Sequence, residues 1–138
     1  MTLMTSEPIG TGGWSAVARE TQSVVRAPLT VNVTATARCL ASPAVSGLEV
    51  VSRTVTLPNN SVLLDLVSGS VQCPSGKSMV GGGARILAAN NGIPPYLALV
   101  TSTPSENGWT ALARETSDAD RSLGVNLTVS AVCAILPP

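Results

Sequence analysis

The feature that most constrains this chain is a stretch of sequence that occurs twice. The matching segments are Trp14–Thr21 (WSAVARET) with Trp109–Thr116 (WTALARET), and Val31–Cys39 with Val125–Cys133. Shorter matches upstream, such as Leu3-Met-Thr with Leu99-Val-Thr, keep nearly the same offset of about 95 residues. A constant offset along the whole match indicates an internal duplication, so we expect the two copies to share one local structure.

The two copies are not equally complete. A segment that spans roughly Leu48–Leu87 precedes the second copy and has no counterpart before the first. We therefore predict the rear half of a repeat unit at 1–41, a linker at 42–47 and a complete unit at 48–138. A half unit alone exposes apolar sheet and open edges. We expect it to pack on the complete unit or to be completed by another chain.

Hydrophobic periodicity predicts an all-β chain. Val125–Val132 alternates apolar with polar residues, which is the period of a half-buried strand, and Val31–Arg38 does the same. Further strands are expected at Trp14–Glu20, Leu48–Leu57, Ser61–Val71 (one strand or two), Ser78–Ala88, Tyr96–Thr103 and Trp109–Glu115. Turn residues separate these runs, and no window of ten or more residues carries a capped helical stripe. The expected fold is an antiparallel β-sandwich or a barrel-like fold with an internal duplication.

Composition limits the core and the partners. Aromatic residues make up only 2% of the chain, so the core must consist of Val, Leu, Ala and Ile. Charged residues make up 12% and the formal net charge is zero, which argues against binding to nucleic acid. Little repulsion then opposes close self-association.

Two observations bear on location. No apolar run approaches the about 20 residues that span a bilayer, so we expect no membrane insertion. Met1–Gly10 has neither a basic nor an apolar segment typical of a secretion signal. We expect an extracellular or virion surface, reached after removal of a signal or by cell lysis, with retention inside the cell as the alternative.

Residues that could carry chemistry do not form a convincing site. The chain has no His, so a Ser-His nucleophile is excluded. Gly76-Lys-Ser78 has part of a phosphate-loop motif, but Val71 stands where that motif needs a glycine. Nothing selects a carboxylate pair, and Asp118 with Asp120 supplies too few oxygen ligands for calcium. We therefore expect no enzyme activity, no cofactor and no metal.

The tryptophans leave two interpretations open. Trp109 together with Tyr96, and secondly Trp14, are candidate platforms on which a glycan could stack. The alternative for both tryptophans is an anchor in the core or between the sheets. Gly81–Gly83 predicts a bulge, or a close approach of the backbone to the Trp109 ring.

One segment resembles a known signature. Cys73–Ile86 (CPSGKSMVGGGARI) is similar to the C-P-x-G-K-x-V-x-G-G-G-A-x-I signature of tandem β repeats in bacterial secreted proteins, especially actinobacterial ones. Further similar segments are Gly47–Ser52, Ser102–Pro104, Gly108–Glu115 and Ala131–Ala134. That family has no assigned function, so the resemblance implies an architecture rather than an activity.

The resemblance also implies a disulfide. Each unit of that family carries one Cys near its front and one in its last strand, which implies a Cys73–Cys133 bond. It would close a loop of about 60 residues and contribute about 3–4 kcal/mol. Cys39 then has no partner in its own half unit and is either a free buried thiol or a link to another chain. In a reducing compartment all three would stay thiols.

These features together favour a binding or structural protein. The first expectation is a non-catalytic structural or adhesive module of an extracellular or particle surface, self-associating through sheet completion into a homo-oligomer or with neighbouring structural subunits. A virion decoration or fibre protein is a variant of this expectation. A small carbohydrate-binding module that uses Trp109 and Tyr96 is the alternative.

Overall fold

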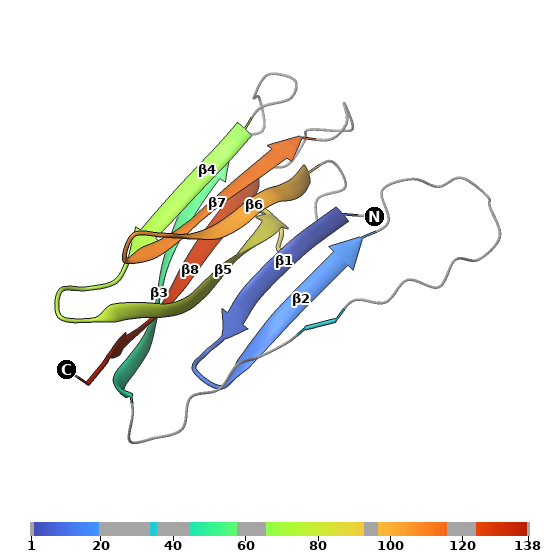
Figure 1. Ribbon diagram of the computed structural model, residues 1–138. Coiled ribbons are helices and arrows are strands. Elements are labelled where there is room, and N and C mark those ends of the chain that lie inside the picture. Colours follow the sequence, from blue (N-terminus) through green and yellow to red (C-terminus); the bar gives the residue numbers. More distant parts are fainter. Residues whose placement is uncertain are drawn as a thin grey trace.

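The computed structural model describes residues 2–19, 34–35, 45–57, 66–92, 97–115 and 124–137. In these residues there are eight β-strands and no helix (Figure 1). The strands are β1 (Thr2–Ile9), β2 (Gly13–Arg19), β3 (Ser46–Leu57), β4 (Leu66–Gln72), β5 (Ser78–Ala88), β6 (Leu97–Ser105), β7 (Gly108–Glu115) and β8 (Val125–Ile135). Accordingly, this part of the chain contains no apolar helix of bilayer-spanning length.

The strands form two antiparallel sheets. The larger has the order β2-β1-β5-β8-β3 and the smaller the order β4-β7-β6. The smaller sheet packs over β3, β8 and β5, and its edge strand β6 also contacts β1 (Figure 1). The sandwich predicted from the periodicity is confirmed.

The core lies between the sheets and is aliphatic, as the lack of aromatic residues required. Leu127 and Val129 of β8, Ile86 of β5, and Ala111 and Ala113 of β7 are fully buried. They occupy alternate positions, because successive side chains of a strand point to opposite faces. The small side chains of these alanines let the backbone of β7 lie close to β5 and β8 of the larger sheet.

The outer face of β3 and β8 carries uncharged polar side chains. They pair across the strands as Ser52 with Ser130 (Oγ–Oγ 2.8 Å), Thr54 with Thr128 (Oγ1–Oγ1 3.0 Å) and Thr56 with Asn126 (Oγ1 to Oδ1, 2.8 Å). Such cross-strand pairs each contribute about 0.2–1 kcal/mol to the sheet. They make this face polar without adding charge.

Two glycines of β5 allow neighbouring groups to lie very close to this strand. The strand has an irregular register between Met79 and Gly81, and a Cβ at Gly82 would lie 2.5 Å from Cδ2 of Trp109. The predicted approach to the Trp109 ring is confirmed, whereas the register shift lies at Val80, just before Gly81–Gly83 rather than within it. A Cβ at Gly83 would overlap the carbonyl oxygen of Ser6 in β1, an approach that was not predicted.

The Cys73–Cys133 disulfide is present, with a Cα–Cα distance of 5.6 Å. Cys73 directly follows β4 and Cys133 lies in β8, so the bond joins the smaller sheet to the larger one. Cys39 lies outside the described residues.

Several strand limits differ from those predicted. β6 continues past Thr103 to Ser105 and contains Pro104, which is tolerated because β6 is an edge strand. Of the predicted strand Val31–Arg38 only Thr34 and Ala35 are described, and neither lies in a strand. β1 was not predicted at all.

Candidate functional site

Two hairpins of this fold are copies of each other. In β1–β2, Thr5 faces Val17 and Ser6 faces Ala16; in β6–β7, Thr101 faces Leu112 and Ser102 faces Ala111. Each hairpin has one register shift, between Leu3 and Thr5 in the first and between Leu99 and Thr101 in the second. The repeat in the sequence is therefore also a repeat of hairpin structure. The boundaries of the two units stay a prediction.

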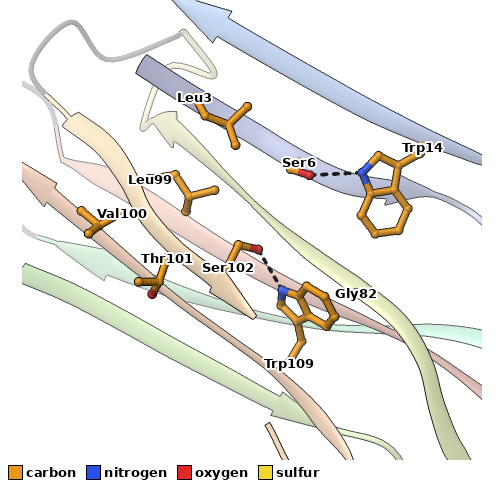
Figure 2. A pocket seen from close by; sticks show the side chains of 9 residues that line it. All are labelled: Leu3, Ser6, Trp14, Gly82, Leu99, Val100, Thr101, Ser102 and Trp109. Carbon is orange, nitrogen blue, oxygen red and sulfur yellow. Dashed lines mark hydrogen bonds between the residues drawn. The ribbon is translucent and has the colours of Figure 1, made fainter. Parts of the chain in front are cut away.

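The same hydrogen bond holds the tryptophan of each hairpin. Trp14 Nε1 donates to Ser6 Oγ at 3.1 Å, and Trp109 Nε1 donates to Ser102 Oγ at 2.8 Å (Figure 2). Each serine lies on the strand paired with that of its tryptophan, so the bond crosses the hairpin. It satisfies the indole N–H and fixes the plane of the ring.

The two hairpins differ in what surrounds them. β7 lies between β4 and β6, and its Ala111 and Ala113 are 0% exposed. Among the described residues β2 ends the larger sheet, and Ala16 and Ala18 at the same repeat positions are only half-buried. The first hairpin therefore keeps an apolar face and a strand edge that the second hairpin buries.

A narrow contact attaches the first hairpin to the complete unit. β1 pairs with β5 only at Thr5 with Arg85 and at Ser6 with Ala84. Met4 inserts into the core and is 1% exposed. The first hairpin thus packs on β5 of its own chain through β1.

An ion pair lies beside this contact. Arg85 Nη1 is 3.5 Å from Glu7 Oε1. Partial burial raises the pKa of the Glu7 carboxyl, and the Arg85 guanidinium lowers it by a smaller amount. Desolvation therefore outweighs the attraction of the nearby cation.

A cleft of about 340 Å³ opens between the two hairpins (Figure 2). We call it the indole cleft; it is lined by Leu3, Ser6, Trp14, Gly82, Leu99, Val100, Thr101, Ser102 and Trp109. Three equivalent pairs from the two copies contribute to it, namely Leu3 with Leu99, Ser6 with Ser102, and Trp14 with Trp109. None of these described lining residues carries a charged side chain.

The residues predicted to form a ligand platform are not all among the described residues of the indole cleft. Trp109 lines the indole cleft and also packs against Gly82 and the core, so its contact with the core is confirmed and its role as a platform stays a prediction. Tyr96 lies outside the described residues. Trp14, which the sequence offered only as a second candidate, lies in the same cleft. The recurrence of a serine upstream of each tryptophan was the signal that would have found Ser6 and Ser102.

The Gly76–Ser78 segment forms a turn that leads into a strand, and no helix follows it. Lys77 Nζ lies 2.8 Å from Glu49 Oε1 and donates to the Gly47 carbonyl at 2.6 Å, so this lysine joins the turn to β3. Within the described ranges, no three His, Cys, Asp or Glu side chains gather in a way that would hold a metal ion.

Comparison of the chain with protein-family models, with curated proteins and with solved structures finds no match. The likeness to bacterial tandem β repeats therefore stays a prediction, and function must be argued from the geometry of the hairpins and of the cleft.

Proposed function

We propose that this chain is a non-catalytic structural module of an extracellular or particle surface that associates with itself by pairing strands at β2. The observation that carries this proposal is the position of β2. It is the repeat equivalent of β7, which has a strand on each side, yet among the residues that the structure describes β2 is the last strand of its sheet. An edge strand offers unpaired backbone N–H and C=O groups to a further strand.

The sequence of β2 does little to prevent such pairing. Gly13–Arg19 has no proline, and its one charged residue, Arg19, stands at its end. Natural edge strands usually carry proline, inward-pointing charges or lysines that block another strand. β2 therefore lacks the usual protection.

A second copy of this chain is the partner that β2 fits best. Antiparallel pairing of two β2 strands about Ala16 would set Trp14 of each opposite Ala18 of the other, so that a large side chain meets a small one. Such an interface is self-complementary and closes with twofold symmetry. The net charge of zero leaves little long-range repulsion between copies.

The outer surface and the disulfide support the proposed location. The hydroxyl pairs on β3 and β8 give a polar, uncharged face, and disulfides persist in oxidising surroundings such as secreted and virion-surface proteins.

The proposal is tested by placing a lysine on β2. Ser15→Lys introduces a charge in the middle of the edge strand and is expected to weaken self-association roughly tenfold, about 1.4 kcal/mol. Ser68→Lys makes the same change in β4, an edge strand of the smaller sheet, and is expected to leave association unchanged. Sedimentation velocity over a dilution series measures both.

A wild-type chain that stays monomeric at every concentration would contradict the proposal. So would an equal effect of the two substitutions, because the interface would then not lie at β2.

A further inference from the structure

We propose that the indole cleft binds a neutral saccharide. This inference does not depend on self-association at β2, because the cleft lies between the two hairpins of one chain (Figure 2).

The size and lining of the cleft suit a small ligand. Its volume of about 340 Å³ lies in the range of about 300–1,000 Å³ that is usual for ligand pockets. Two indoles and two leucines supply apolar surface, and Ser6, Thr101 and Ser102 supply hydroxyl groups. An apolar wall with a few polar groups is the common pattern of such sites.

The aromatic surfaces are fixed before a ligand arrives. Each indole N–H is already engaged by a serine, so the rings offer their faces and edges rather than a hydrogen bond. The Trp109 ring also rests on Gly82, where a Cβ would lie within 2.6 Å of its Cε3. Fixed rings lose little conformational entropy on binding.

The absence of charge in the lining narrows the ligand class. An anion or a cation would find no charged side chain among the lining residues and would still lose its hydration. A purely apolar ligand would cover hydroxyl groups without bonding them, at a cost of about 1–3 kcal/mol each. A pyranose ring has C–H faces that pack on indoles and hydroxyls that bond serine and threonine, so it satisfies both parts of the lining.

The test is isothermal titration calorimetry of the intact, oxidised chain with chitotetraose, cellotetraose and mannotetraose as probes. We expect at least one of them to bind saturably and to change the fluorescence of the tryptophans, since Trp14 and Trp109 are the two in the chain. Trp14→Ala is expected to weaken that binding roughly tenfold through loss of one stacking surface.

Two further variants keep the result interpretable. Thr101→Trp fills the cleft from an exposed position and should abolish binding without disturbing the core. Leu66→Ala removes an exposed apolar side chain on β4, away from the cleft, and should leave binding unchanged.

Three results would overturn the assignment. They are failure of all three saccharides to bind, binding that survives both Trp14→Ala and Thr101→Trp, and binding of the apolar dye ANS in the cleft when no saccharide binds. Ser15→Lys should retain saccharide binding, so that failure of the cleft proposal and failure of the β2 proposal give different results.

Discussion

Single residues of β5 decide how closely its neighbours approach. Gly82 makes room for the Trp109 ring of the smaller sheet, while Gly83 makes room for the backbone of β1. Gly81, next to both, has only the Trp14 ring near its side-chain position, at an ordinary contact distance of 3.9 Å. Three adjacent glycines therefore have three different packing requirements.

Alanine substitution separates these requirements. Gly83→Ala should destabilise the fold by about 1–3 kcal/mol or more, because its methyl group meets the Ser6 carbonyl oxygen and pushes β1 away from β5. Gly81→Ala should change the free energy of unfolding by no more than about 0.5 kcal/mol. Urea denaturation of both variants measures this difference. Equal losses in the free energy of unfolding would show that β1 does not approach Gly83 as closely as described.

At this scale the sequence predicted some contacts and missed others. The run Gly81–Gly83 predicted the close contact with Trp109, and the family resemblance implied the Cys73–Cys133 bond. The two Trp–Ser bonds were missed, because in a chain rich in Ser and Thr a recurring serine gives only a weak signal.

At the level of the strands, β1 was not predicted because its sequence lacks the regular pattern of a strand. Its bulge lies at Met4, so Leu3 and Met4 are adjacent apolar residues and the alternation that marks a strand is broken. Pro8 is a further signal against a strand, but β1 pairs with β5 only at Thr5 and Ser6, before the proline is reached. The long strand β8 was predicted because nothing interrupts its alternating pattern.

The stability of the contact between β1 and β5 should depend on pH. The pKa of Glu7 is raised in the folded state, so the ionised carboxylate opposes folding at neutral pH. As pH falls through the folded pKa, the native state takes up a proton before the unfolded state does, and this penalty disappears. Relative to Glu7→Gln, the wild type should therefore gain stability as pH is lowered from about 7 towards 4.

Urea denaturation of both proteins at several pH values measures this difference. A wild type that loses stability relative to Glu7→Gln on acidification would mean that the Arg85 ion pair, rather than burial, controls the carboxyl.

For the whole molecule, the sequence predicted the fold class but not the place of each hairpin. Alternation of apolar residues predicted the sandwich, and the nearly constant offset predicted that the two copies share one local structure, which the structure shows to be a hairpin. Local sequence cannot say which edge a hairpin joins, since that depends on which strand edges the rest of the chain leaves open. The second hairpin joins β4 in the smaller sheet, whereas the first joins β5 in the larger one.

The repeat-equivalent strands β2 and β7 have different neighbours, and the proposed self-association follows from that difference. β7 has a partner strand on each side, whereas β2 pairs with β1 and, within the part of the chain that the structure describes, ends its sheet. Amide groups paired with another strand exchange their hydrogens slowly, and unpaired edge groups exchange quickly. If β2 is the site of self-association, its amides should become protected when a second copy binds.

Hydrogen–deuterium exchange of peptides from β2 and β7, followed over a range of protein concentrations, tests this claim most directly. We predict that β2 exchanges faster than β7 in dilute solution and gains protection as concentration rises, while β7 stays protected throughout. Equal protection of β2 and β7 at every concentration would contradict the account.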